Sequence, residues 1–352
     1  MKIIHTSDLH IASPLTSRLS ARLAARRRKE IAGVPERIAM EARRIGASVI
    51  MIAGDLFDSE KVTAEDVEKL RDVISAYSDL KFVYVMGNHE GGTLKKYDMP
   101  DNFVSVTSDE WQYIDVGDLR ISARAKCFPG MFDDLEVREG VNIALLHGEL
   151  SNSKSEGAVN LNEAAKAGIN YLAMGHYHSY SAINVTDGCV AVYSGTPEGR
   201  GFDEVGECGY VLVDTDGGVS HKFVPFSVRT LHDISLDTNG KVRTLELESM
   251  IKSTLSKISE DDLVKLRLTG ERRIEEKPDA KALTERLTGR FAHIEVIDET
   301  RPEIKPEELM YDKTLKGEFI RLVLADAELE ENEKYRIIDC GIKALLGEAF
   351  DE

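Results

Sequence analysis

Cysteine is scarce in this 352-residue chain, and its four copies stand far apart. None forms a CxxC pair, which argues against a zinc ribbon and against a disulfide framework. No apolar run approaches the roughly 20 residues that a membrane-spanning helix requires. The opening residues, MKIIHTSDLH, are too short and too polar for a secretory signal. We therefore expect a cytoplasmic protein that makes no membrane contact.

Basic residues are outnumbered by acidic ones, 45 Lys and Arg against 62 Asp and Glu. The net charge of −17 argues against a protein that coats nucleic acid. The first 50 residues are an exception, with ten Lys and Arg against four Asp and Glu. Four of these basic residues lie three or four apart, on one face of a predicted helix: Arg18, Arg22, Arg26 and Lys29. This face is either solvated or a contact for the phosphate backbone of DNA, and the sequence alone leaves both interpretations open.

The first part of the chain alternates strands and helices. Apolar, β-branched stretches at 2–7, 47–54 and 81–87 predict strands, with helices expected near 16–45 and 63–77. This order predicts parallel strands with helices packed on the sheet. Short strands separated by turns follow up to residue 226. We expect an α/β fold over residues 1–226, a four-layer α/β/β/α sandwich of two mixed sheets flanked by helices.

The alternation restarts after residue 226. Strands are expected at 230–236, 263–270 and 291–297, with helices near 243–258 and 279–288. Helical segments follow from about 307 to 348. Residues 227–352 are thus predicted to form a small C-terminal α/β domain, a capping or accessory domain with terminal helices.

Five short polar motifs each follow an apolar strand in the first part. Their chemistry is carboxylate, amide and imidazole: Asp8-Leu9-His10, Gly54-Asp55, Gly87-Asn88-His89-Glu90, His147-Gly148-Glu149 and Gly175-His176-Tyr177-His178. The carboxyl ends of strands converge on one edge of an α/β sheet, so these motifs should meet. The mixture suits manganese, iron or zinc better than calcium. Seven ligands are enough for two ions that share one carboxylate, a common arrangement for attack on phosphorus.

The order DxH, GD, GNH, H and GHxH resembles that of the calcineurin-like metallophosphoesterases. Within them, GDLFD and the segment YSGTPEGRGFDEVGECGYVLVD (193–214) resemble the SbcD and YhaO-like branch of double-strand-break-repair nucleases. LVKLRLTGE (263–271) is similar to the domain that follows the nuclease in YhaO-like proteins. The resemblance implies a two-metal-dependent phosphodiesterase, a DNA exonuclease or endonuclease in DNA repair. In such an enzyme a metal-bridging hydroxide attacks the phosphorus in line.

The resemblance also implies roles for single residues. Seven ligands are implied, three for a first ion, three for a second and one that bridges them: Asp8, His10 and His178; Asn88, His147 and His176; and Asp55. His89 would be catalytic, because it faces the phosphate and orients or protonates the leaving oxygen. The two ions are expected to be Mn²⁺, with iron or zinc as alternatives.

The chain departs from the family pattern at two places. Glu90 stands where the family commonly has the aspartate of GNHD, and we expect it to hold the His89 ring through a hydrogen bond. Ala12-Ser13 follow Ile11 where the family commonly has DxHxG, which leaves the shape of the loop after His10 open. A later loop contains Thr196, Glu198 and Arg200, which either touch the substrate or belong to a plain turn.

Three questions of function stay open at this point. DNA is the expected substrate, and a phosphodiesterase or phosphatase for a small phosphoester is the alternative, since many families share the metal core. A scaffold without catalysis is disfavoured because every expected ligand and His89 are present. The apolar spacing in the helix at 333–348 favours packing on its own domain. Docking of an SbcC-like ATPase partner is the alternative there, and the related nucleases imply a homodimer.

Overall fold

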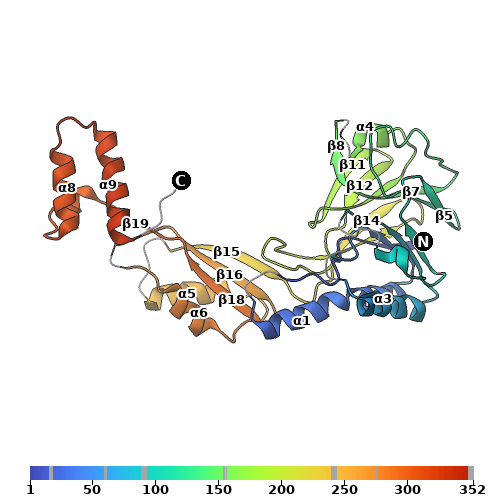
Figure 1. The fold of residues 1–352 in the computed structure, drawn as a ribbon, viewed down its shortest axis with the longest axis horizontal. Helices are drawn as coiled ribbons and strands as arrows, with labels where there is room; N and C mark the ends of the chain where they lie inside the picture. Colours follow the sequence, from blue (N-terminus) through green and yellow to red (C-terminus); the bar gives the residue numbers. More distant parts are fainter. Residues whose placement is uncertain are drawn as a thin grey trace. The chain divides into compact units, whose positions relative to one another are not determined.

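The computed structural model describes residues 1–15, 19–58, 62–88, 93–153, 155, 157–238, 244–274 and 276–347. The chain divides into two compact units, Met1–His232 and Asp233–Glu352 (Figure 1). Within the described ranges, no helix has both the length and the apolar composition needed to cross a membrane. The expected division into two domains after residue 226 stays a prediction.

The first sheet of unit 1 contains the N-terminal strand at its centre. Its members are β1 (Lys2–Thr6), β2 (Ala47–Ala53), β3 (Lys81–Val85), β4 (Phe103–Val106), β13 (Gly209–Asp214) and β14 (Ser220–Pro225). They lie in the order β14-β13-β1-β2-β3-β4. Strands β1 to β4 are parallel, whereas β13 runs antiparallel to β1 and β14 antiparallel to β13.

The second sheet is also mixed. Its members are β5 (Gln112–Val116), β6 (Leu119–Ala123), β7 (Val141–His147), β10 (Tyr171–Gly175), β11 (Ser181–Thr186) and β12 (Cys189–Tyr193). They lie in the order β11-β12-β10-β7-β6-β5, with the four inner strands parallel and the two edge strands antiparallel. Two short strands, β8 (Glu149–Ser151) and β9 (Ala158–Asn160), pair outside it.

An apolar core joins the two sheets. Val49 and Val83 of the first sheet and Ile143 and Leu145 of the second belong to one buried cluster. The opposite face of the first sheet packs against α2 (Val34–Ile45) and α3 (Ala64–Ala76), through residues such as Ile38. Because side chains alternate along a strand, each buried strand serves both interfaces.

The helices complete the predicted arrangement. The single helix expected near 16–45 is two helices, α1 (Ala21–Ala32) and α2, divided at Gly33. Pro35 lies in the first turn of α2, where the missing N–H of proline costs no hydrogen bond within the helix. The outer face of the second sheet is covered by loops and by the single-turn helix α4 (Leu161–Ala164). A separate 3₁₀ turn spans Thr93–Lys96. The predicted four-layer α/β/β/α class is confirmed, with a thin layer on this side.

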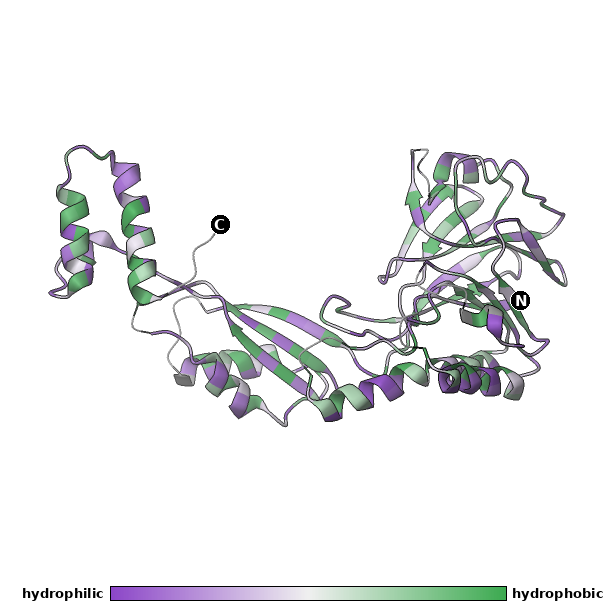
Figure 2. Ribbon diagram, in the orientation of Figure 1, coloured by the Kyte–Doolittle hydropathy of each residue, from purple (hydrophilic) through white to green (hydrophobic). Residues whose placement is uncertain are grey.

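Unit 2 contains a three-stranded sheet with helices on one face. The strands are β15 (Leu231–Asp237), whose first two residues precede the division at Asp233, β16 (Leu263–Thr269) and β18 (His293–Asp298). The helices are α5 (Thr244–Thr254) and α6 (Ala280–Leu287). Strand β16 alternates apolar and polar residues (Figure 2), so that Val264 and Leu266 pack with Ile251 and Leu283 of the helices. The small C-terminal α/β fold is therefore as predicted.

A helical segment follows this sheet. It contains α7 (Pro306–Leu309), α8 (Leu315–Ala325) and α9 (Glu331–Leu346), preceded by the two-residue strands β17 (Glu271–Arg272) and β19 (Arg301–Pro302). Ile320 of α8 packs with Ile338 and Ile342 of α9. Part of the apolar spacing of α9 therefore serves packing inside the unit, while Tyr335 and Leu345 are exposed.

Candidate metal centre

The candidate ligands lie at the carboxyl ends of parallel strands from both sheets of unit 1. The structure forms two groups of three candidate ligands, and within each group the ligand atoms lie within 4.8 Å of one another. The first group is Asp8, His10 and His178, and the second is Asp8, Asp55 and His147. Asn88 joins them through its Oδ1, which lies 2.7 Å from Nε2 of His147. The ring of His176 lies 5.5 Å from that of His147. Asp8 is shared by the two groups, and the division of ligands between two ions stays a prediction.

The backbone at the centre adopts a conformation that L-residues rarely take. Asp8, His10, Asp55 and His176 have φ values of 53°, 44°, 48° and 109°. Each such residue costs roughly 1–3 kcal/mol, and such residues gather at functional sites. Backbone hydrogen bonds between the loops that follow β1 and β2 hold these loops in place. The N–H of Asp8 donates to the Gly54 carbonyl (3.1 Å), and the N–H of His10 donates to the Asp55 carbonyl (2.9 Å).

Glycine precedes the ligand in three motifs because the space for a Cβ is already occupied. A Cβ at Gly54 would lie 2.1 Å from Nδ1 of His147, and one at Gly87 would lie 2.1 Å from Oδ1 of Asp55. At Gly175 it would lie 1.7 Å from the carbonyl oxygen of Ala53. The glycines therefore allow the backbone to approach the ligand side chains.

Two buried carboxylates stand at the middle of the centre. Asp8 is fully buried and Asp55 is 1 % exposed. Both oxygens of Asp8 accept the N–H of His176 at 3.2 Å. Burial raises the pKa of Asp8 to about 6, although the neighbouring His147 acts to lower it. A nearby cation would stabilise two buried carboxylates this close to each other.

His147 shows how a cation would be received. Its Nδ1 lies 2.8 Å from the Ala53 carbonyl, which only accepts, so Nδ1 carries the hydrogen. Its Nε2 then faces two further acceptors, Oδ1 of Asn88 at 2.7 Å and Oδ2 of Asp55 at 3.4 Å. Burial alone would lower the pKa of His147, but Asp55 raises it to about 9. When Nε2 carries no hydrogen, three acceptor atoms converge, namely Nε2 of His147, Oδ1 of Asn88 and Oδ2 of Asp55. Such a set fits a divalent ion.

The other imidazoles have matching spacings. Nε2 of His178 lies 4.0 Å from Oδ1 of Asp8, and Nε2 of His10 lies 3.8 Å from Oδ2 of Asp55. Two atoms that share one ion, with bonds of roughly 2.0–2.2 Å, lie up to about 4.3 Å apart. Burial lowers the pKa of His10 to about 3. The donor set therefore fits divalent ions.

Glu204 is a residue that the sequence did not single out. It is 5 % exposed, and its Oε1 lies 2.8 Å from Nδ1 of His178. Burial would raise the pKa of Glu204, but hydrogen bonds from His178 and Arg200 lower it to about 2. The only signal in the sequence is its position inside the 193–214 segment, since nothing in that segment marks it as a partner of a histidine 26 residues earlier.

The loop that contains Glu204 is held by buried contacts. The Thr196 hydroxyl donates to the carbonyl of Asp8 at 2.9 Å. Glu198, 1 % exposed, pairs with Arg27 and Arg37, each at 2.8 Å. Of the three loop residues considered for substrate contact, Thr196 and Glu198 therefore support the loop, while Arg200 lies beside His178.

The basic face of α1 is exposed where the structure describes it. Arg22, Arg26 and Lys29 are solvent-accessible, and Arg26 pairs with Glu30. Arg18 lies outside the described residues, as do the predicted catalytic His89 and its neighbour Glu90.

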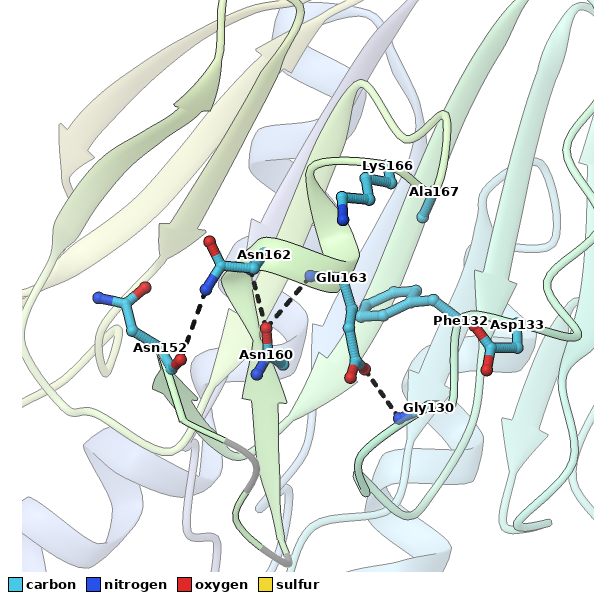
Figure 3. A pocket seen from close by; sticks show the side chains of 9 residues that line it. All are labelled: Gly130, Phe132, Asp133, Asn152, Asn160, Asn162, Glu163, Lys166 and Ala167. Atoms are coloured by element: carbon cyan, nitrogen blue, oxygen red, sulfur yellow. Dashed lines mark hydrogen bonds between the residues drawn. The ribbon is translucent and has the colours of Figure 1, made fainter.

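A cleft of about 780 Å³ adjoins the centre. Its lining includes Asn88, His147 and His176, together with Lys126 and Glu149. A second cleft, of about 480 Å³, lies beside α4 (Figure 3). Its lining contains none of the candidate ligands, and its polar groups serve the local fold. Glu163, for example, accepts the N–H of Gly130, and Asn160 caps α4. Of these two clefts, the first is therefore the one that adjoins the candidate ligands.

Two mixed sheets with histidines and carboxylates gathered at their strand ends define a metallophosphoesterase. Residues 1–218 match the calcineurin-like phosphoesterase superfamily domain, and the chain belongs to this superfamily. The family resemblance found in the motifs is therefore confirmed.

Two curated relatives share low identity with the chain. The uncharacterized metallophosphoesterase YhaO of Bacillus subtilis is 26% identical over 290 residues, 73% of this chain and 68% of YhaO. The DNA double-strand break repair protein Mre11 of Methanopyrus kandleri is 27% identical over 266 residues, 64% of this chain and 56% of Mre11. Among solved structures, a dimetal phosphatase from Danio rerio aligns with a TM-score of 0.42 and 9% identity, over 60% of this chain and 92% of the phosphatase.

Proposed function

We propose that the protein is a two-metal-dependent phosphodiesterase that cleaves DNA. The observation that carries the metal-dependent part is the convergence of Asn88, His147 and Asp55 acceptors beside buried Asp8. DNA as the substrate is supported by the likeness to Mre11, which is named for DNA double-strand break repair, and by the basic face of α1. The net charge of −17 and the moderate size of the cleft favour the alternative, a small phosphoester.

The proposed ligands are the seven side chains implied by the resemblance, and the proposed ions are Mn²⁺. Bound ions would neutralise charge on the phosphoryl oxygens and supply an acidic water as nucleophile. The chain's own residues orient the site. Ala53 fixes the ring of His147, and the N–H of His176 fixes the carboxylate of Asp8. His89, next in sequence to Asn88, is proposed to protonate the leaving oxygen.

The test is a substrate panel in Mn²⁺, with EDTA as the negative control. We expect Mn²⁺-dependent degradation of single- or double-stranded DNA, faster than hydrolysis of bis-p-nitrophenyl phosphate or cyclic nucleotides. Replacement of Mn²⁺ by Fe²⁺ or Zn²⁺ in the same assay ranks the three metals. Activity confined to the small esters would establish the alternative and remove DNA as the substrate.

His89→Ala is the matched inactive variant for this panel. Loss of a general acid lowers kcat by roughly 10²–10⁴-fold. Because His89 is not a proposed ligand, the variant should still bind two Mn²⁺ ions in a calorimetric titration. A variant that keeps wild-type kcat would show that His89 has no catalytic role.

The basic face of α1 predicts a salt effect on DNA binding. Each phosphate contact contributes about 0.9 to the slope of log affinity against log salt concentration on duplex DNA. Replacing Arg22, Arg26 and Lys29 together by glutamine should therefore flatten that slope by up to about 2.7. Lys69→Gln is the control, because Lys69 is an exposed residue of α3 that pairs with Glu65. This variant should leave the salt slope unchanged. An unaltered slope in the triple variant would identify the face as merely solvated.

Unit 2 is proposed to be an accessory domain that offers a surface for a partner. Three large apolar side chains near α8 are widely exposed, Tyr311 at 77%, Leu315 at 68% and Leu322 at 65%. Leu315 and Leu322 lie seven residues apart on α8 and therefore on one side of it, and exposed apolar side chains on one side of a helix are typical of an interface. An SbcC-like ATPase is the partner implied by the family resemblance, and a homodimer is the alternative.

A further inference from the structure

We propose that Glu204 is a positioning residue that selects the metal-binding tautomer of His178, in competition with Arg200. The proposal rests on the metal centre of the proposed function. It concerns which nitrogen of His178 carries the hydrogen, because only a nitrogen without one can bind an ion.

Glu204 determines this choice through a buried contact. A carboxylate only accepts hydrogen bonds, and its Oε1 lies 2.8 Å from Nδ1 of His178. Nδ1 must therefore carry the hydrogen, which leaves the lone pair on Nε2. That nitrogen is on the side of the candidate centre, 4.0 Å from Oδ1 of Asp8. The Glu204 carboxylate thus turns the donor atom of His178 toward the proposed ion.

Arg200 would select the opposite tautomer. Its guanidinium only donates, and Nη2 lies 3.2 Å from the same Nδ1 of His178. With Glu204 in place, Arg200 is engaged instead by the carboxylate, through its backbone N–H at 2.6 Å and its Nε at 2.9 Å. Without the carboxylate, Arg200 would donate to Nδ1 and move the hydrogen to Nε2, where it would occupy the position of the ion. The same pair of side chains therefore has opposite effects on metal binding.

This opposition separates the proposal from an ordinary salt bridge. If the pair only stabilised the loop, removal of either partner would have the same consequence. If Glu204 selects the tautomer, Glu204→Gln should weaken one of the two Mn²⁺ binding events by about 10–100-fold. Arg200→Gln should leave both events at wild-type affinity or tighten one. The double variant Glu204→Gln/Arg200→Gln should recover affinity relative to Glu204→Gln, because the new amide oxygen at position 204 can accept the hydrogen of Nδ1 once the guanidinium no longer competes for that nitrogen.

The experiment is a calorimetric titration of the metal-free full chain with MnCl₂ for the wild type and the three variants. Thermal unfolding in EDTA is measured in parallel, so that loss of affinity is separated from loss of folding. In the metal-free protein labelled with ¹⁵N-histidine, nitrogen shifts report the tautomer directly, and the His178 signal is assigned by its absence in His178→Asn. We expect Nδ1–H in the wild type and Nε2–H in Glu204→Gln.

The outcomes distinguish this proposal from the proposed function. A wild-type chain that does not bind two ions removes the metal centre itself. A wild type that binds two, with a folded Glu204→Gln variant of equal affinity, overturns the role of Glu204 alone. Equal losses in Glu204→Gln and Arg200→Gln also overturn it. If Glu204→Gln does not fold, Glu204→Asp retains the charge but withdraws the carboxylate, and wild-type affinity in that variant contradicts the proposal.

Discussion

Gly87→Ala is expected to abolish most metal-dependent activity while the chain stays folded. The new Cβ would lie 2.1 Å from Oδ1 and 2.5 Å from the backbone nitrogen of Asp55, so the proposed bridging carboxylate must move. Displacement of a catalytic group by about 1 Å costs about 10²-fold in rate. We expect a loss of at least this size, with fewer than two Mn²⁺ ions bound, measured by phosphodiester hydrolysis and by calorimetric titration.

Gly188→Ala is the control for this substitution. Gly188 lies in the turn between β11 and β12, and a Cβ there would have no heavy atom within 4 Å. It should therefore retain both activity and metal stoichiometry. Wild-type activity in Gly87→Ala would mean that Asp55 is not needed where the structure places it, and the proposed centre would have to be redrawn.

Arg27→Met is expected to cause the largest loss of stability among the charged residues of α1. Arg27 is 1 % exposed, its Nη1 lies 2.8 Å from Oε1 of Glu198, and its Nη2 donates to the carbonyl of Gly199 at 2.6 Å. Removing one partner of a buried ion pair costs up to roughly 3–5 kcal/mol, and here it would leave Glu198 with Arg37 as its remaining partner among the two arginines. The free energy of unfolding, measured in urea, should fall by about this amount.

Arg26→Met is the matched comparison, one residue away on the same helix. Arg26 is 60% exposed and pairs with Glu30 at 3.1 Å. Exposed pairs contribute about 0–1 kcal/mol, so this change should have little effect on unfolding. Similar losses in the two variants would show that the Arg27 network does not hold the loop that carries Glu198.

The fold was predictable where a local pattern carried the signal. Strands such as β2 and β7 are long apolar runs that end at a polar motif, and they formed as expected. Strand β4 was not predicted because FVSV, at 103–106, has only four residues and too short an alternation to stand out. The break of the first helix at Gly33 was missed as well, although Pro35 marks it in the sequence.

In the candidate centre, too, residues marked by a local sequence pattern were predictable and residues that act through tertiary contacts were not. Its seven proposed ligands lie at or just after strand ends, so topology alone predicts their meeting. In the structure, five of them form two groups that share Asp8, and Asn88 and His176 lie beside His147. Glu204 and Arg27 were not predicted because their roles depend on how a loop folds back on distant residues. Arg27 lies within the basic run RLSARLAARRRK, yet composition cannot distinguish this buried arginine from the exposed Arg26 and Arg28 beside it.

The central position of β1 has a consequence for the order in which the site is completed during synthesis. This first strand lies between β2, made soon afterwards, and β13, which ends at Asp214. One edge of β1 therefore stays unpaired on the ribosome until some two hundred further residues have been translated. Asp8 and His10 are made well before His178 and Glu204, so the group of Asp8, His10 and His178 forms only after the later residues have been translated. The proposed metal site therefore stays incomplete until most of the first unit has been translated.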